Sequence, residues 1–305
     1  MSNNHALPFS QYQVDAETHT DISIIIPVHN EERRIVDCLQ RTMRYCSDQQ
    51  WDFKLIVAED GSTDDTVKLV NDFSRSDKRI KLVSSTERLG KGGAIKKAIQ
   101  ASIKSHYIGY MDVDLAADPS EFQRLLAQIK NTDIVIGSRI LRGDLPPIQR
   151  PLRRSIFSYA FSITFRTLFK IPIYDPQCGF KLFTRDAALR LFSDITTSGF
   201  AFDSEIIVKA FAHGMRVKEV PIMWQHIPGS KINVIHQINE MGKSLLKIWC
   251  MYHLIWLQGK PVYPQKKGSL KGRLLFKTLA PILKPEVETR DQEEQKPSNY
   301  HSLAH

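Results

Sequence analysis

The chain has 305 residues, of which 42% are hydrophobic and 25% are charged, so it can bury the core of one large domain. Its net charge of +9 favours an anionic partner, such as a nucleic acid, a phospholipid surface or a phosphorylated substrate. Four scattered cysteines without a Cys-x-x-Cys pair argue against a zinc site or a disulfide framework, and they fit a reducing compartment.

The amino-terminal segment does not look like a targeting or membrane segment. Residues 1–20 are polar and lack the apolar stretch of a signal peptide, so we expect a flexible leader. No uninterrupted apolar run in the chain reaches the roughly 20 residues that a membrane-spanning helix needs. We therefore expect a protein that is soluble or lies on a membrane without crossing it.

Strands and helices alternate along the first half of the chain. Short apolar runs at 21–28, 53–58 and 80–83 are each followed by a pattern typical of a helix, and further strands are expected before Asp112 and at 133–139. This alternation predicts right-handed crossovers and a mostly parallel sheet, so we expect an α/β fold. Ligands of such sheets bind beyond the carboxyl ends of the strands, where the polar loops fall.

Two of these loops have local signals of their own. Asn30 is expected to cap the helix after the first strand. The segment 87–94 contains three glycines and two basic residues at a helix start, which suits an anion bound by backbone N–H groups. A plain glycine turn between a strand and a helix is the alternative for that segment.

The paired acids Asp112 and Asp114 follow a buried strand. Where a strand gives way to a loop, two such carboxylates can converge on a hard cation, with phosphate oxygens of a nucleotide completing the coordination. The alternative is a solvated acid pair at a strand end, because an Asp-x-Asp pattern alone is common.

Several stretches together resemble the inverting family-2 glycosyltransferases. They are IIIPVHNE at 24–31, EDGSTDDT at 59–66, RLGKGGA at 88–94, DVDLA at 112–116 and IGSR at 136–139. The later stretches DPQCGFKLFTR at 175–185 and FAFDSE at 200–205 resemble the polyprenyl-phosphate sugar synthases, and within them the dolichyl-phosphate glucosyltransferases most closely. The resemblance covers about residues 20–235.

The resemblance implies a Rossmann-like nucleotide-diphospho-sugar transferase fold of the GT-A type, with a mostly parallel central sheet and helices on both faces. At the carboxyl end the chain departs from the transmembrane anchors of some relatives, and there we expect amphipathic helices. It implies transfer of a hexose, glucose from UDP-glucose, to a polyprenyl or dolichyl phosphate with inversion. The alternatives are a GDP-mannose donor, or a hydroxyl acceptor that would demand a true general base. A basic nucleic-acid or membrane-binding module is disfavoured, because it leaves Asp60, Asp112 and Asp114 unexplained.

The resemblance also assigns the donor side of the site. It implies that Pro27, Glu31, Asp60, Ser62, Lys91 and Gly92 bind the nucleotide sugar, and that Asp112 and Asp114 hold Mg²⁺ or Mn²⁺ against its diphosphate. Many mannose-type members carry a glutamine shortly after the paired acids. Here the sequence continues Leu115-Ala116-Ala117-Asp118, which favours the glucosyl type.

On the acceptor side, arginines are the natural partners of a lipid phosphate, because the planar guanidinium binds phosphate in a bidentate manner. We expect Arg139, Arg153, Arg154 and Lys231 to bind it, with a solvated basic turn as the alternative for the arginines. An acceptor phosphate is already an anion, so a strong base is less necessary. Asp175 and Asp203 are candidates, with Asp114, for catalytic roles.

The rest of the chain is expected to serve attachment. Phe157, Phe161, Phe165 and Leu168 share one helical face, which predicts a core helix or, alternatively, a lipid-facing surface. We expect a catalytic domain at 21–235, basic amphipathic helices at 236–285 that attach to a membrane surface, and a disordered tail at 286–305. A partner helix or a homo-oligomer contact is the alternative for 236–285. The expected location is cytoplasmic, on the cytoplasmic face of a membrane, and no nucleic acid is expected.

Overall fold

The computed structural model describes residues 20–141, 145, 152–197, 199, 201–225, 227 and 242–252. The chain divides into two compact units, residues 1–263 and 264–305, and every described residue lies in the first. Several predicted features fall outside the described residues: the leader up to residue 19, the side chains of Arg153 and Arg154, Lys231, the tail, and residues 236–241 and 253–285 of the expected amphipathic helices.

A seven-stranded sheet forms the centre of this unit, with the strand order β3-β2-β1-β4-β6-β5-β7. Its strands are β1 (Thr20–Val28), β2 (Phe53–Glu59), β3 (Ile80–Val83), β4 (Ser105–Tyr110), β5 (Ile134–Ser138), β6 (Lys181–Thr184) and β7 (Val217–Pro221). All neighbours pair in parallel except β6, which runs antiparallel to both β4 and β5. The mostly parallel sheet that the sequence predicts is confirmed, and β1 to β5 lie where the apolar runs predict strands.

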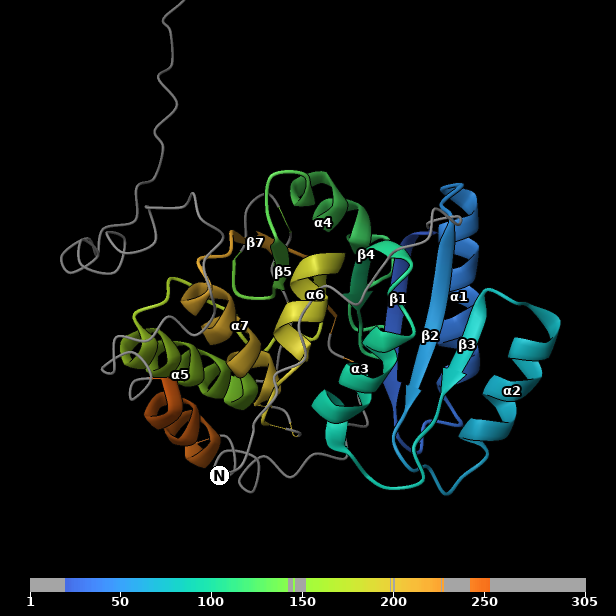
Figure 1. Ribbon diagram of the computed structural model, residues 1–305, viewed down its shortest axis with the longest axis horizontal. Helices are drawn as coiled ribbons and strands as arrows, with labels where there is room; N and C mark the ends of the chain where they lie inside the picture. The colour runs from blue at the N-terminus through green and yellow to red at the C-terminus, as the bar shows by residue number, and fades with distance from the viewer. Residues whose placement is uncertain are drawn as a thin grey trace, which may run out of the picture. The chain divides into compact units, whose positions relative to one another are not determined.

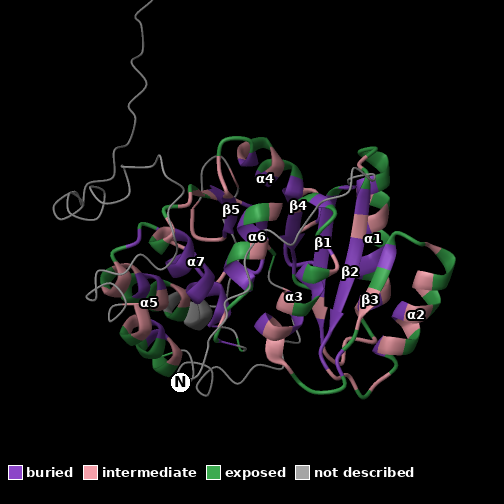
Figure 2. Ribbon diagram, viewed as in Figure 1, coloured by how far each residue is buried: buried purple, intermediate pink, exposed green. Residues whose placement is uncertain are grey.

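Helices cover both faces of the sheet (Figure 1). They are α1 (Ile35–Asp48), α2 (Thr66–Ser76), α3 (Gly90–Gln100), α4 (Glu121–Ile129), α5 (Leu152–Phe169), α6 (Arg185–Phe192) and α7 (Phe202–Ala212). Alternate residues of a strand point to opposite faces, so β1 contributes Ile24 to the cluster under α1, α2 and α4, and Ile25 to the cluster under α3, α5, α6 and α7. Burial on both faces explains why the parallel strands read as continuous apolar runs (Figure 2).

Two predictions about helices need correction. Asn30 does not cap α1: its backbone lies in the left-handed region, with φ 55°, and the helix begins four residues after Glu31, at Ile35, without a side-chain cap. Residues 242–252 form a further helix, but its Leu245 and Ile248 are buried in the cluster under α3, α5, α6 and α7. This part of the predicted attachment region therefore packs onto the catalytic domain.

Within the described residues, no helix is both long enough and apolar enough to cross a membrane. The helix α5 buries Phe165 completely and packs Phe161 and Leu168 partly, as a core helix would. Phe157, predicted on the same buried face, is 41% exposed. The core assignment of α5 is thus correct for Phe161, Phe165 and Leu168 but wrong for Phe157, near the start of the helix.

The reversed direction of β6 determines where the site forms. The strands β1, β2, β4 and β5 are parallel and end at one edge of the sheet, and the segment before β6 reaches that same edge because β6 runs the other way. Residues 174–180 are therefore brought beside the loops that follow β4 and β5.

Candidate functional site

The loops after β1 and β2 are held together by polar contacts. The backbone N–H of Asn30 donates to Ser62 Oγ at 3.0 Å, and Asn30 Oδ1 accepts from the Thr63 N–H at 2.7 Å. The Glu31 N–H donates to Thr66 Oγ1 at 2.9 Å. The left-handed Asn30 thus fastens one loop to the other. Pro27, at the end of β1, and Glu31 lie together with Ser62 at this corner, where the sequence predicts the nucleotide.

Asp60 joins the second loop to the glycine loop. Its side chain is almost fully buried, and Oδ1 accepts from the Leu89 N–H at 2.5 Å. Arg88 Nε lies 3.8 Å from Oδ2. One carboxylate oxygen is therefore committed to holding the start of α3 in place.

Glycine is required at positions 90 and 92 of the glycine loop for two different structural reasons. Gly90 has φ 74°, which is a left-handed conformation that favours glycine. A Cβ on Gly92 would lie 2.7 Å from Cβ of Phe202, so the missing side chain lets α3 pack closely against α7. For Gly92 this packing is the contact that the structure records, and binding of the nucleotide sugar stays a prediction.

Lys91 and the paired acids meet at the end of β4. Lys91 Nζ lies 2.6 Å from Asp112 Oδ1. Burial lowers the pKa of Lys91, but the charges of Asp112 and Asp203 outweigh burial and raise it overall. Gly179 comes so close that a Cβ there would lie 2.1 Å from Asp112 Oδ2. Asp112 is therefore confined between α3 and the loop before β6.

Asp114 has a different environment. Its Oδ1 accepts from the Ala116 N–H at 3.0 Å, and the intervening Leu115 has φ 56°. Burial raises the pKa of Asp114, and the neighbouring charge of Asp112 raises it further. Asp112 and Asp114 carry like charges and repel each other. A hard divalent cation bound to their oxygens would relieve this repulsion, so the pair fits Mg²⁺ or Mn²⁺. The described residues contain no group of three or more acidic, histidine or cysteine side chains for a metal.

Asp114 also borders a cavity of about 540 Å³. Its wall includes Arg33 and Arg34, which precede α1, Arg41 within α1, and Met223 and Gln225 from the segment after β7. The Gln225 N–H donates to the Ala116 carbonyl at 2.7 Å, so this later segment contacts the loop of the paired acids directly.

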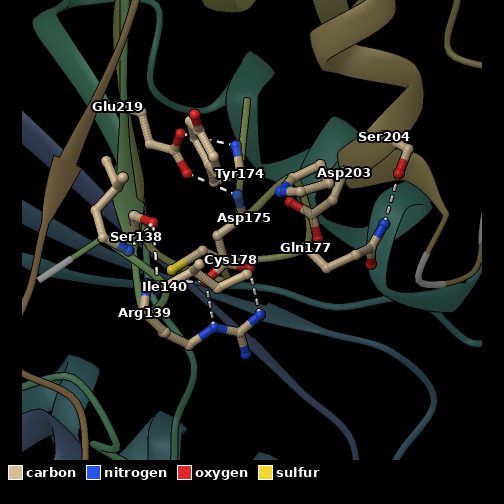
Figure 3. Close-up of polar contacts among 12 residues, drawn as sticks. Ser138, Arg139, Ile140, Tyr174, Asp175, Gln177, Cys178, Asp203, Ser204 and Glu219 are labelled. Atoms are coloured by element: carbon tan, nitrogen blue, oxygen red, sulfur yellow. Dashed lines mark hydrogen bonds and ion pairs between the residues drawn. The ribbon is translucent and has the colours of Figure 1, made fainter. Parts of the chain in front are cut away.

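Arg139, directly after β5, and Asp175, before β6, form a largely buried ion pair. Arg139 Nε and Nη2 donate to the two oxygens of Asp175, each at 2.7 Å, and the Arg139 N–H donates to Oδ2 at 2.8 Å. Asp175 is 2% exposed. Asp175 lies between Arg139 and Glu219 (Figure 3). Glu219 was not singled out from the sequence.

Asp203 lies deeper. Its Oδ1 accepts from Tyr110 Oη at 2.5 Å and forms a close ion pair with Lys181, and all three side chains are buried. Burial raises the pKa of Tyr110 well above its usual value, and the Asp203 charge adds to this rise. Lys181 also donates to the carbonyls of Pro176 and Cys178, at 3.1 and 2.6 Å. Through these hydrogen bonds of Lys181, the buried cluster holds the loop before β6 in place.

The structure thus gathers Pro27, Glu31, Asp60, Ser62, Lys91, Gly92, Asp112, Asp114, Arg139, Asp175 and Asp203 at or beneath one sheet edge. Sequence reasoning missed Lys181 and Tyr110, which are opposite each other in the register of β4 and β6 and both contact Asp203. It also missed Gly179, although Gly179 stands within the stretch 175–185 that carries part of the family resemblance.

Comparison with known proteins agrees with this geometry. Residues 23–192 match Glycosyl transferase family 2. The chain is 34% identical over 250 residues to a dolichyl-phosphate beta-glucosyltransferase of Dictyostelium discoideum, covering 77% of this chain and 76% of that one. It is 31% identical over 246 residues to the human enzyme of the same name, covering 76% and 75%. It is also 31% identical over 233 residues to the glycosyltransferase AglD of Haloferax volcanii, covering 75% of this chain but only 37% of AglD.

Among solved structures, glucosyl-3-phosphoglycerate synthase from Mycobacterium tuberculosis, in complex with Mn²⁺, UDP and glucosyl-3-phosphoglycerate, superimposes with a TM-score of 0.56 at 18% identity. The match covers 75% of this chain and 78% of that one, and at this identity it shows a shared fold. The chain therefore belongs to glycosyltransferase family 2 and has the GT-A fold.

Proposed function

We propose that this protein transfers glucose from UDP-glucose to a dolichyl or related polyprenyl phosphate, with inversion at the anomeric carbon. The observation that carries the proposal is the Asp112 and Asp114 pair at the sheet edge, in a chain 34% identical to a dolichyl-phosphate beta-glucosyltransferase. GDP-mannose is the competing donor.

In the proposed reaction, an oxygen of the lipid phosphate attacks C1 of the glucose from the face opposite UDP. The bond between C1 and the β-phosphate oxygen breaks, and UDP leaves with the bonding electron pair. The products are a β-glucosyl lipid phosphate and UDP. Because the attacking oxygen already carries charge, no side chain needs to remove a proton.

Asp112 and Asp114 would hold Mg²⁺ or Mn²⁺. When bound, the metal would neutralise the charge that develops on the departing UDP. Lys91 lies 2.6 Å from Asp112, and we assign it to the diphosphate together with the amino end of α3. Pro27, Glu31, Asp60 and Ser62 are assigned to the nucleoside, at the corner where the first two loops meet.

We assign Arg139 to the acceptor phosphate, with Asp175 holding its guanidinium in one orientation. Asp203 is enclosed by Tyr110 and Lys181. We therefore assign it to holding the surrounding loops in place and not to contact with a substrate. Arg153, Arg154 and Lys231 remain predicted partners of the same phosphate.

The acceptor is a lipid, so we propose peripheral attachment to the cytoplasmic face of a membrane. The side of α5 that faces away from Phe165 supports this, because Tyr159 and Ile163 on that side are 47% and 61% exposed. Large apolar side chains grouped on an exposed helix favour an interfacial position. A homo-oligomer contact through the same helix is the alternative.

The test is to incubate the purified chain with Mn²⁺ and either radiolabelled UDP-glucose or GDP-mannose, together with a polyprenyl phosphate or the corresponding free polyprenol. We expect label in the lipid phase only with UDP-glucose and the phosphate, in a β linkage, and loss of transfer in excess EDTA. Mannose transfer would change the donor assignment. Transfer to the free alcohol would contradict the proposed phosphate acceptor.

A further inference from the structure

Glu219 of β7 connects two loops at the acceptor side of the site. One carboxylate oxygen accepts from the Asp175 N–H at 2.6 Å, and the other accepts from the Tyr174 N–H at 2.8 Å. The two N–H groups belong to consecutive residues and point at the two oxygens of one carboxylate (Figure 3). Such charge-assisted bonds are stronger than neutral ones and fix the backbone direction at Asp175.

The second loop is the one that follows Ser138, the last residue of β5. Burial raises the pKa of Glu219, on the neighbouring strand β7, and the Ser138 hydroxyl lowers it. Ser138 Oγ accepts from the Ile140 and Leu141 N–H groups at 3.3 and 3.1 Å. The residue between Ser138 and Ile140 in the chain is Arg139. Glu219 therefore holds the backbone at Asp175 directly, and it adjoins the hydroxyl that holds the backbone after Arg139.

The Arg139 guanidinium has its direction set by this arrangement. It bonds to both oxygens of Asp175, and the Arg139 backbone N–H bonds to Asp175 as well. If the backbone at Asp175 turned, the carboxylate would turn with it, and so would the plane of the guanidinium. Bidentate recognition of a phosphate depends on that plane.

We propose that Glu219 is a positioning residue for the acceptor phosphate: it acts through Asp175 and Ser138 to fix the orientation of Arg139. The proposal rests on the proposed function, in which Arg139 binds that phosphate. It assigns no contact between Glu219 and substrate.

Glutamine is the sharpest replacement at this position. Glu219→Gln keeps the size and one carbonyl oxygen, but its amide N–H₂ group would face a backbone N–H and could not accept its hydrogen bond. One loop attachment would be lost and a donor–donor conflict introduced, while the Arg139–Asp175 side chains would remain present.

A matched control lies at the other end of the same two strands. Asp133, just before β5, accepts from the Arg216 N–H at 2.8 Å and from Arg216 Nε and Nη2 at 3.2 and 3.0 Å. Asp133 thus ties β5 to β7 with an Asp–Arg pair of the same design as Asp175 and Arg139, but at the edge away from the site. Asp133→Asn removes one carboxylate charge, as Glu219→Gln does.

The experiment measures steady-state kinetics with UDP-glucose and a polyprenyl phosphate titrated separately, and UDP binding in the presence of Mn²⁺ by calorimetry. We expect Glu219→Gln to raise the KM for the lipid phosphate about tenfold and to lower kcat, with the affinity for UDP within about twofold of the wild type. Asp133→Asn should leave all three quantities near the wild-type values.

A double-mutant cycle with Arg139→Lys shows whether Glu219 acts through Arg139. In the Arg139→Lys background, Glu219→Gln should add little to the loss already present. Additive losses, or equal kinetics in Glu219→Gln and Asp133→Asn, would overturn the assignment. If Glu219→Gln does not fold, Ser138→Ala decides: a raised KM for the lipid phosphate supports the proposal, and an unchanged KM overturns it. No transfer by the wild type would instead overturn the proposed function itself.

Discussion

At the scale of single residues, three acids of the site each have a basic partner. Asp112 pairs with Lys91, Asp175 with Arg139 and Asp203 with Lys181. Each pair is close to neutral, so none of them adds net positive charge for two phosphorylated substrates. Asp114 instead accepts a backbone N–H, and its pKa is raised. The charge balance at this edge therefore favours binding of a divalent cation along with the diphosphate.

Gly179 offers a direct test of the Asp112 geometry. In Gly179→Ala, the new Cβ would lie 2.1 Å from Asp112 Oδ2 and 2.7 Å from Cγ, so the short Asp112 side chain must move. We expect Mn²⁺ to bind about tenfold more weakly and turnover to fall by roughly one to two orders of magnitude, because Asp112, the proposed metal ligand, is displaced. Mn²⁺ binding followed by electron paramagnetic resonance, and transfer activity, are the measurements.

The matched control for that substitution is Gly199→Ala, where a new Cβ would meet no atom within 4 Å and φ is not left-handed. It should leave both quantities unchanged. Wild-type Mn²⁺ affinity in Gly179→Ala would mean that Asp112 does not hold the metal.

Residues differ in how far the sequence reveals them. Asp112 and Asp114 stand out because two acids directly after an apolar run have no role in the core. Glu219 stands in Val217–Pro221, where a charged residue in a short alternating strand looks like a solvent-facing side chain. Its partners Tyr174 and Asp175 lie 45 and 44 residues away along the chain, so no local pattern points to them.

At the scale of elements, the first five strands were predictable because each contains an apolar run, which in β1, β2 and β5 is almost wholly buried. The two later strands were not. The strand β6 is only Lys181–Thr184 and begins with a charged residue, which is buried because Asp203 pairs with it. Its antiparallel insertion between β4 and β5 depends on pairing across the sheet and not on any signal within the strand.

The end of α7 gives a prediction about pH. His213 follows this helix, and burial lowers its pKa to about 4, with the charges of Lys209 and Arg190 adding to the effect. Since the unfolded chain binds the proton more readily, near pH 6.5, the contribution of neutral His213 to stability is present above that pH and is lost as the pH falls toward 4. We expect a loss of about 1 kcal/mol between pH 7 and pH 5, allowing for partial exposure.

Chemical denaturation at the two pH values measures this loss. His213→Gln should remove about that amount of the pH dependence, whereas the exposed His106→Gln should leave it as in the wild type. An identical pH dependence in His213→Gln and the wild type would show that other groups cause it.

At the scale of the whole molecule, the apolar surface of α5 lies in an uncharged stretch. Residues 155–165 contain no charged side chain, while Arg153 and Arg154 precede them and Arg166 and Lys170 follow. One side of the helix packs into the core through Phe165, and the other exposes Tyr159 and Ile163. Such a helix suits the boundary of an anionic bilayer, with apolar side chains inserted and basic ones at the lipid phosphates.

The helix at 242–252 changes how membrane attachment should be tested. Removing everything after residue 231 would delete Leu245 and Ile248, which are 4% and 0% exposed in the core. A loss of membrane binding in that truncation would then be indistinguishable from damage to the fold. A truncation after Tyr252 keeps both residues and removes the later basic segment.

Membrane binding is therefore best tested with one substitution on α5 and one truncation. Ile163→Glu places a charge at a side chain that is 61% exposed, where it would enter the bilayer boundary. Its control is Gln100→Glu, which makes the same charge change at the exposed end of α3. In sedimentation with vesicles containing phosphatidylserine, we expect Ile163→Glu to weaken binding about tenfold, truncation after Tyr252 to weaken it further, and added salt to weaken binding of the intact chain. Equal binding by Ile163→Glu and Gln100→Glu would show that α5 does not face the lipid. The contact with the membrane would then belong to the segment after Tyr252. If Ile163→Glu instead changes the mass of the protein in solution, the exposed side of α5 is an interface between two copies of the chain.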